Sequence, residues 1–284
     1  MISVVHLGLV SYGEGIQLQR KLVDLRKVGE IGDVLLLLEH SPVITLGRNA
    51  KTANVLASAD ALAGRGVEVF ECDRGGDVTF HGPGQMVGYP IFDLRGHELT
   101  SLNCDLRSRN FAGEGARSTQ ARKTLGAVDY VRRLEEMLIR TCDDFGIVTH
   151  RVAGLTGVWT DGTSSMPDRA GRERKVAAIG VHISRSVTSH GFALNVNTDL
   201  SYFNLIVPCG ITAKPVTSLQ KELGKEIDMD AVTKSITRNF GSVFRSEMLS
   251  VETLDALLGN TIGVPMKAPA ELRQIRGEDE LFFG

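Results

Sequence analysis

Residues 74–85 read Arg74-Gly75-Gly76-Asp77-Val78-Thr79-Phe80-His81-Gly82-Pro83-Gly84-Gln85. The glycines of this stretch can adopt positive φ and let the backbone approach a ligand closely, while Pro83 stiffens the turn. Strand-like runs flank the stretch, residues 67–70 before it and 86–92 after it. We therefore predict a binding loop that two strands hold in place. The alternative is a solvated hairpin loop.

Strand and helix patterns alternate irregularly on both sides of this stretch. Strand patterns cover residues 3–10, 34–38, 42–47, 175–183 and 192–197, and helical patterns cover 16–27, 125–146, a short helix opened by a capping box at 217–220, 229–244 and 251–258. Residues 34–38 form an unbroken apolar run, which is typical of a central strand covered on both faces. The last two strands form a hairpin around residues 185–190. This order predicts an α/β (α+β) fold, a mixed β-sheet flanked by helices.

The long helix predicted over residues 125–146 is amphipathic. Its spacing places Leu125, Val128, Val131, Leu134, Leu138 and Phe145 inward and Arg132, Arg133, Glu135, Glu136 and Arg140 outward. We therefore expect this helix to serve the core.

Length and charge restrict the possible functions. The chain has 284 residues, a length at which one core begins to divide, so we expect one main domain with an appendage. Its 32 basic and 34 acidic residues nearly cancel, so no overall charge favours nucleic acid or an anionic membrane as partner. The first residues lack a signal-like apolar stretch, and no run approaches the roughly 18 apolar residues of a spanning helix. We expect a cytoplasmic protein.

The four cysteines are far apart in the chain. None forms a Cys-x-x-Cys pair, which fits neither a disulfide framework nor a zinc knuckle and favours a reducing compartment. Cys142 lies in the predicted long helix and Cys72 ends a strand, so both are interpreted as buried apolar residues, and Cys104 begins a polar tract. Cys209 lies between Pro208 and Gly210, in a turn that could expose a nucleophilic sulfur. An ordinary turn is the alternative.

Lys175 begins an apolar strand, where burial of its side chain would favour the neutral amine. The alternative is a strand-edge lysine that reaches into water. The next strand contains the run His190-Gly191-x-Ala193-x-Asn195-x-Asn197, in which polar residues at alternate positions would line one face. They could contact a ligand or water.

Together these segments resemble the octanoyltransferases of lipoate synthesis, within the biotin and lipoate protein ligase fold family. The matching motifs are residues 37–48, 74–85, 175–181, 190–196 and 208–211, in the expected order. The resemblance covers roughly residues 1–225, which we predict to be the catalytic domain. A helical extension over 226–260 would pack on it, and 261–284 would form a peripheral tail.

The resemblance implies a reaction and its partners. Octanoyl carried on acyl carrier protein would pass to a lysine of a lipoyl domain, in the E2 subunits of 2-oxoacid dehydrogenases and in the glycine cleavage H protein. Cys209 would accept the acyl group as a thioester, and Lys175 would act as its base and later as proton donor. The resemblance implies no ATP and no metal.

The resemblance also implies the residues that bind substrate. They are Arg74, Gly75, Gly76, Asp77, Val78, Thr79, Phe80, His81, Gly82, Ala178, Ile179, Gly180, His190, Gly191 and Ala193. The candidate walls for the octanoyl chain are Gly157, Val158, Trp159, Leu46 and Val78.

Two polar tracts, residues 104–123 and 161–174, look longer and more basic than the resemblance requires. We hypothesise that Arg107, Arg109, Arg172 and Arg174 steer an acidic carrier protein or lipoyl domain toward the pocket. A solvated loop is the alternative.

Three other functions fit parts of the pattern. A lipoate or biotin ligase also has a glycine-rich loop and a strand lysine, but it activates its acid with ATP and needs no nucleophilic thiol. A silent module would only dock lipoyl domains. A hydrolase would pass the acyl group from a cysteine to water.

Overall fold

The computed structural model describes residues 1–96, 124–161, 173–208, 214–251, 254 and 257. Within these residues the strands form a seven-stranded sheet in the order β10-β1-β2-β6-β9-β8-β7 and a three-stranded sheet in the order β4-β3-β5. The large sheet contains β1 (Ile2–Val10), β2 (Asp33–His40), β6 (Gln85–Ile91), β7 (Val158–Thr160), β8 (Arg174–Ser184), β9 (Val187–Asn195) and β10 (Met248–Val251). The small sheet contains β3 (Val43–Leu46), β4 (Glu68–Glu71) and β5 (Val78–His81). Parallel pairing of β1 with β2 and antiparallel pairing of β2 with β6 confirm the predicted mixed sheet.

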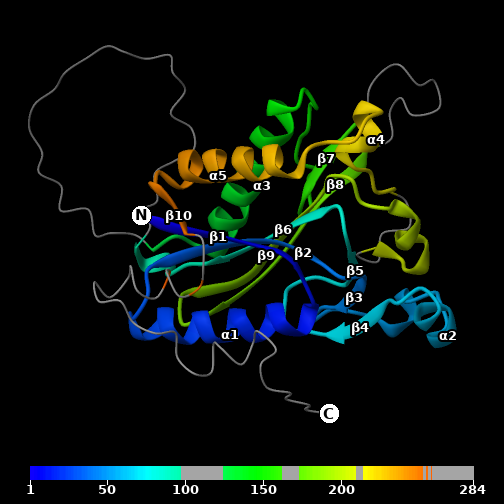
Figure 1. The fold of residues 1–284 in the computed structure, drawn as a ribbon, viewed down its shortest axis with the longest axis horizontal. Helices are drawn as coiled ribbons and strands as arrows, with labels where there is room; N and C mark the ends of the chain where they lie inside the picture. Colours follow the sequence, from blue (N-terminus) through cyan, green and yellow to red (C-terminus); the bar gives the residue numbers. More distant parts are fainter. Residues whose placement is uncertain (97–123, 162–172, 209–213, 252–253, 255–256, 258–284) are drawn as a thin grey trace, which may run out of the picture.

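Helices cover both faces of the large sheet (Figure 1). Helix α1 (Tyr12–Val28) lies on one face, and α3 (Ala127–Asp144) and α5 (Met229–Phe244) lie on the other. Shorter helical segments are α2 (Ala59–Ala63), α4 (Leu219–Leu223) and the 3₁₀ turns η1 (Thr52–Asn54), η2 (Leu94–Gly96) and η3 (Leu200–Leu205). The helices thus form the outer layers of a sheet buried on both sides.

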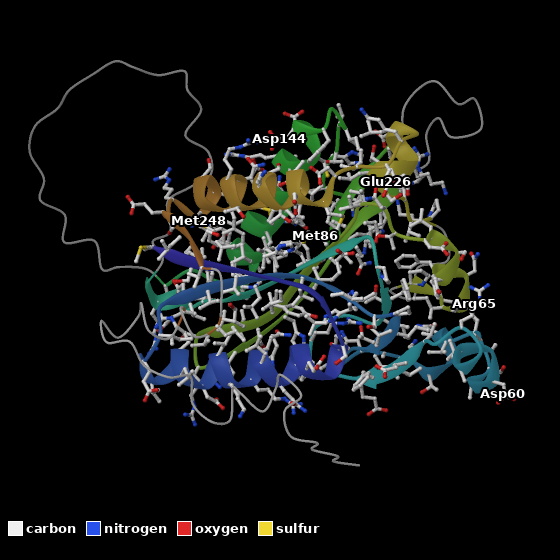
Figure 2. The ribbon with its side chains drawn as sticks, in the orientation of Figure 1. Asp60, Arg65, Met86, Asp144, Glu226 and Met248 are labelled. Atoms are coloured by element: carbon white, nitrogen blue, oxygen red, sulfur yellow. The ribbon has the colours of Figure 1, made fainter. Side chains whose placement is uncertain are left out.

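The apolar run in β2 connects the two cores. Leu35 and Leu37 belong to the core beneath α3 and α5, whereas Val34, Leu36 and Leu38 belong to the core beneath α1. Figure 2 shows side chains filling both layers, and its labelled Met86 belongs to the core beneath α3 and α5. The prediction of a central strand covered on both faces is confirmed.

Three predictions of strands and helices are wrong in part. The stretch of residues 74–85 is not loop throughout, because residues 78–81 form β5 and pair with β3. Residue 251 does not begin a helix, because it ends β10, which pairs in parallel with β1. The short helix α4 begins after Ser218, whose side chain accepts from the backbone N–H of Lys221, so the predicted capping box at residues 217–220 does not form.

The long helix α3 also differs from its predicted orientation. Val128 is 72% exposed, because it lies in the first turn of the helix, while Arg133 and Glu135 are buried. Glu135 accepts hydrogen bonds from Arg132, Arg151 and the backbone N–H of Gly157. Because these donors satisfy the carboxylate, it can lie inside the protein.

The hairpin of β8 and β9 is confirmed, with a tighter turn than predicted. Its turn residues Arg185 and Ser186 have φ of 52° and 67°. Positive φ at both positions is typical of two-residue hairpin turns. His190 therefore lies in strand β9 and not in the turn.

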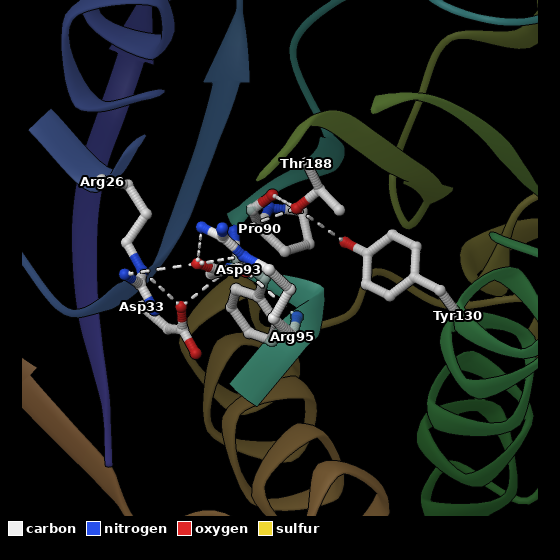
Figure 3. A network of polar contacts seen from close by, with 8 residues as sticks. Arg26, Asp33, Pro90, Asp93, Arg95, Tyr130 and Thr188 are labelled. Atoms are coloured by element: carbon white, nitrogen blue, oxygen red, sulfur yellow. Dashed lines mark hydrogen bonds and ion pairs between the residues drawn. The ribbon is translucent and has the colours of Figure 1, made fainter. Parts of the chain in front are cut away.

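A polar network holds the strand ends far from the glycine-rich stretch (Figure 3). Asp33 accepts from the Arg26 side chain at 2.7 Å and from the backbone N–H of Asp93 at 3.0 Å. Asp93 in turn binds Arg95, which lowers the pKa of the Asp93 carboxyl. Thr188 donates to the Pro90 carbonyl at 2.7 Å. These contacts join α1, β2, β6 and β9.

Helix α5 and strand β10 share the core and sheet of the preceding residues. The domain boundary at residue 225 stays a prediction. Residues 261–284 lie outside the part of the chain that the structure describes, as do residues 104–123. In that part, no helix is long and apolar enough to cross a membrane.

Candidate active site

A pocket lies between β5, β6 and the hairpin of β8 and β9. Twelve of the residues predicted to bind substrate line it, namely Arg74, Gly75, Gly76, Asp77, Thr79, His81, Ala178, Ile179, Gly180, His190, Gly191 and Ala193. The structure therefore brings together motifs that are more than 100 positions apart in the sequence. Their role in substrate binding stays a prediction.

Three of the predicted residues do not line the pocket. Side chains alternate along β5, so Thr79 and His81 face the pocket while Val78 and Phe80 enter a separate core with η3. A Cβ on Gly82 would lie 2.5 Å from the Phe80 ring, so this glycine allows close packing of the turn. Among the predicted acyl walls, Leu46 packs with the same separate core, and residues 157–159 lie beyond β8. None of these walls lines the pocket.

Arg74 is buried and fastens the glycine-rich stretch to β3. Its guanidinium donates to the Thr45 carbonyl at 2.8 Å, to the Thr45 hydroxyl at 2.9 Å and to the Asp77 carbonyl at 2.7 Å. A planar group with several fixed donors suits this arrangement. Arg74 thus shapes the pocket wall through contacts with the protein itself.

Glycine lets the stretch dock on β8. The backbone N–H of Gly75 donates to the Val181 carbonyl at 3.1 Å. A Cβ on Gly180 would lie 2.6 Å from the Gly75 carbonyl oxygen, closer than real side chains come. Glycine was predicted to let the backbone approach a ligand closely. Here it lets the backbone of the glycine-rich stretch approach strand β8 closely.

His81 lies at the base of the pocket as a neutral ring. Its Nδ1 is 2.7 Å from Oε1 of Gln85, whose amide nitrogen donates to Asn195 and to the Phe80 carbonyl. This fixes the Gln85 amide, so Nδ1 of His81 carries the proton. Burial, with the nearby charges of His40 and Arg74, lowers the pKa of His81 to about 3.

The polar residues at alternate positions of β9 have internal partners. Asn195 binds Gln85 and the Thr217 carbonyl, and Asn197 exchanges two hydrogen bonds with the backbone of Ile227. Their amides fix the loops around the pocket. Asn195 also lines a small pocket beside Lys175, so contact of this strand with a ligand stays a prediction.

Lys175 lies at the other end of the hairpin from its turn. Its side chain is buried, and Nζ lies 4.8 Å from the centre of the Trp159 ring. The alternative of a lysine reaching into water is therefore wrong. Lys214 also lies over this ring, at 5.6 Å. Gly157 leaves the room that the lysine occupies, because a Cβ there would lie 3.1 Å from Cε of Lys175.

A smaller pocket at Lys175 lies next to the main one. Thr79, Ala178 and Ala193 line both pockets, and the smaller pocket is also lined by Lys175 and Pro208. Lys175 exchanges backbone hydrogen bonds with Pro215 and Thr217, each of 2.9 Å. The residues that precede and follow the 209–213 segment, Pro208 and Pro215, therefore both lie next to Lys175.

The structure describes two of the four cysteines, and these two differ in burial. Cys142 is fully buried, and burial raises the pKa of its thiol to about 12, as expected of an inert core residue. Cys72 is only partly buried, with its sulfur 3.4 Å from the Leu46 carbonyl oxygen. Cys104 and Cys209 lie outside the described residues, as do Arg107, Arg109 and Arg172.

Arg174 does not fit the steering hypothesis. Its side chain is buried and forms a bidentate ion pair with Glu222, with N–O distances of 3.0 Å. An arginine that is neutralised inside the protein contributes little to long-range attraction. This arginine instead ties the start of β8 to α4.

Sequence reasoning missed several residues at the site. Tyr12, Val87, Tyr89 and Phe192 also line the main pocket. Tyr12 begins α1 and stacks on His81, with ring centres 6.1 Å apart. These residues come from a helix start and from strand positions that look like ordinary core. The alternation of β6 could have indicated Val87 and Tyr89, which share one face.

Comparison with known proteins shows the family. The model of the lipoyl protein ligase A/B catalytic domain matches residues 11–107 and 118–241. An octanoyltransferase of Koribacter versatilis is 56% identical over 284 residues, which cover all of both chains. An octanoyltransferase of Acidobacterium capsulatum is 54% identical, over 91% of this chain and 96% of that protein.

Solved structures confirm the fold at low sequence identity. A bi-partite lipoate protein ligase of Thermoplasma acidophilum superposes with a TM-score of 0.62 at 13% identity, covering 99% of this chain and 98% of that one. Lipoate-protein ligase A bound with ATP gives a TM-score of 0.61 at 12% identity, over 93% and 95%. The chain therefore belongs to the octanoyltransferases, which are acyltransferases built on the lipoyl protein ligase A/B catalytic domain.

Proposed function

We propose that the chain moves octanoyl from octanoyl-acyl carrier protein to a specific lysine of lipoyl domains, as the first step of protein lipoylation. Cys209 carries the acyl group as a thioester, and Lys175 acts as acid and base. The observation that supports these roles is the position of Lys175. It lines the small pocket with Pro208, the residue before Cys209, and its backbone pairs with residues 215–217 after that segment.

The first half-reaction exchanges one thioester for another. Lys175 acts as the base that takes the proton of the Cys209 thiol, and the thiolate attacks the carbonyl carbon of the octanoyl thioester. A bond forms between this carbon and the Cys209 sulfur, and the bond to the carrier's sulfur breaks. The ammonium of Lys175 returns the proton to the departing carrier thiolate.

The second half-reaction forms an amide. The amine of the acceptor lysine attacks the Cys209 thioester, and the carbon–sulfur bond breaks as the carbon–nitrogen bond forms. Lys175 accepts the surplus proton from the nitrogen and passes it to the Cys209 sulfur. Because a thioester is already activated toward amines, the proposed reaction needs no ATP.

The pocket geometry supports an acyl chain as the bound group. The wall includes Val87, Ala178 and Ala193, whose side chains share one face of the sheet and offer apolar surface along the hairpin from Lys175 toward His190. Burying a methylene group is worth about 0.8 kcal/mol. The proposed acceptors are the lipoyl domains of 2-oxoacid dehydrogenase E2 subunits and the glycine cleavage H protein. A bi-partite ligase of this fold was solved with an E2 lipoyl domain.

Transfer without nucleotide tests the proposal. The chain is mixed with octanoyl-acyl carrier protein and an apo lipoyl domain, with and without ATP, and the mass of the domain is followed. We expect octanoylation at equal rates in both, loss of transfer in Cys209→Ala, and retention in Cys72→Ala.

Three results would count against parts of this account. Strict dependence on ATP would indicate a ligase, and release of free octanoate without a modified domain would indicate a hydrolase. Robust transfer by Cys209→Ala would rule out the covalent route.

A further inference from the structure

Two pockets meet at His190. This residue lines the main pocket and also a second pocket. The second pocket lies between α1 and the turn end of the hairpin, with Gln19 and Val23 on one wall and Ser184 and Ser189 on the other. His190 lines both pockets and is 4% exposed. Its ring stands beside Tyr89, which lines the main pocket, and binds Asp73, which lines the second pocket, so the ring lies between the two.

The backbone of His190 is in an unusual conformation that aims its side chain. Regular alternation in β9 would place it on the same face as Phe192 and Leu194, which enter the core beneath α3 and α5. With φ at 56°, its ring instead lies beside Tyr89, with ring centres 6.4 Å apart, in the layer beneath α1. A non-glycine residue with positive φ is uncommon and strained.

Two hydrogen bonds hold this conformation. The backbone N–H of His190 donates to Oε1 of Gln19 at 2.7 Å, and Nε2 of its ring donates to Oδ1 of Asp73 at 2.7 Å. The second oxygen of Asp73 binds His182. Gln19 of helix α1 thus fixes the backbone of His190, and Asp73 fixes its ring, so the ring resists displacement by a ligand.

The length of the main pocket matches a short acyl chain. Ala178 pairs with Ala193 where the main pocket joins the Lys175 pocket, and Val181 pairs with His190 three residues further along. Three strand residues span about 10 Å. The seven carbon–carbon bonds of an extended octanoyl chain span about 8 to 9 Å, at about 1.2 Å of advance per bond.

We propose that His190, held by Asp73 and Gln19, is the end wall that limits the bound acyl chain to about eight carbons. This inference rests on the proposed function, because it takes the main pocket as the acyl site. The imidazole ring meets the terminal methyl group and closes the passage into the second pocket. His190 is thus a specificity-determining residue for chain length.

Substitution of His190 by glycine tests the wall. Glycine adopts the observed φ without strain and removes the ring, so it opens the main pocket toward the second one. Binding of octanoate and decanoate is measured by calorimetry, and transfer is measured from the octanoyl and decanoyl carrier proteins. We expect the ratio of decanoyl to octanoyl, in affinity and in kcat/KM, to rise at least tenfold, as two newly accommodated methylene groups imply.

Ser189→Ala is the matched control, because Ser189 lines only the second pocket and its substitution leaves the wall in place. We expect its decanoyl-to-octanoyl ratio to equal that of the unmodified chain. If His190→Gly does not fold, His190→Asn serves, because asparagine tolerates positive φ and is shorter than histidine. The same rise in the ratio is expected.

The possible outcomes distinguish failure of the proposed end wall from failure of the proposed transferase activity. Folded variants of His190 with an unchanged ratio, beside normal octanoyl transfer, overturn the wall alone. A shifted fatty-acid ratio in a chain that transfers no octanoyl overturns the transferase and supports the wall. A chain that neither binds fatty acids nor transfers octanoyl overturns both.

Discussion

At the scale of single residues, the position of Lys175 depends on a glycine. Gly157 has φ of 121°, and a Cβ there would lie 2.6 Å from the Ala177 carbonyl oxygen and 3.1 Å from Cε of Lys175. Its backbone N–H donates to the buried carboxylate of Glu135 at 3.2 Å. Glu135 of α3 thus fixes the backbone at Gly157. The other side of Gly157 limits the space that the Lys175 side chain can occupy.

We predict that Gly157→Ala lowers octanoyl transfer at least tenfold. The added methyl group must displace the lysine or the strand, and misplacement of a reacting group by about 1 Å can cost 100-fold. Steady-state kcat/KM with octanoyl-acyl carrier protein checks this. Gly154→Ala is the control, because Gly154 also has positive φ, 77°, but a Cβ there would meet nothing within 4 Å. Equal losses in the two variants would mean that backbone strain alone is responsible.

The pocket residues could be predicted from the sequence only where they belong to a recognisable motif. The stretch of residues 74–85 and the hairpin motifs converge on one pocket, although Val78, Phe80 and Gly82 turn away from it. Glu135 was predicted to face solvent because helical periodicity counts every charged residue as outward. Its burial depends on Arg151 and Gly157, which are distant in the sequence.

At the scale of elements, α1 begins with a capping box that sequence reasoning did not use. Ser11 accepts from the backbone N–H of Glu14, and the Glu14 carboxylate accepts from the backbone N–H of Ser11. The helix ends at Gly29, with φ of 80°. These caps define the helix that carries Tyr12 to one pocket and Gln19 to the other.

We predict that Ser11→Ala lowers the free energy of unfolding by about 1 kcal/mol, the usual cost of losing such a cap. Urea unfolding followed by circular dichroism measures it. Ser11→Thr keeps the hydroxyl and is expected to lose less than half as much. A neutral Ser11→Ala variant would show that the cap contributes nothing here.

Strands were predictable where apolar residues made up most of a strand-length run. The run in β2 identified a central strand, and the β8–β9 pattern identified a hairpin. Strand β5 was missed because glycines surround its four residues, and β10 was missed because its apolar residues also fit a helix. Only pairing with β3 and with β1, which no local pattern contains, decides these two.

At the scale of the whole molecule, a cluster of buried rings makes stability depend on pH. Burial lowers the pKa of His40 to about 4, and burial with nearby charges lowers that of His81 to about 3. His40 binds the Val10 carbonyl and the Tyr89 hydroxyl, and its ring lies 6.0 Å from that of His81. Both histidines are therefore neutral inside the folded chain.

We predict that the chain loses stability as the pH falls from about 6.5 toward 4. In this window the unfolded chain binds protons at these histidines, whose ordinary pKa is about 6.5, while the folded chain does not. The loss is about 3 kcal/mol or less for His40. Urea unfolding between pH 4.5 and 7.5 gives the slope.

The matched variant is His40→Gln, which removes the titrating ring and should flatten the slope. An equal slope in the variant and the unmodified chain would place the acid sensitivity elsewhere.

The architecture as a whole was predictable as a mixed sheet between helices, because strand and helix patterns alternate irregularly along the chain. The division into a large and a small sheet could not be predicted from the sequence. It arises because β3, which follows β2 in the chain, pairs with β4 and β5 and not with the strands of the large sheet. This division places the glycine-rich stretch of the small sheet against the hairpin of the large one (Figure 1).

The proposed acyl-enzyme is the central claim, and one measurement tests it most directly. The chain is incubated with octanoyl-acyl carrier protein without acceptor, and its intact mass and peptide map are recorded. We predict one octanoyl group per chain, located on Cys209 and labile to hydroxylamine as a thioester is. An unmodified chain, or an octanoyl group that persists in Cys209→Ala, would contradict the account.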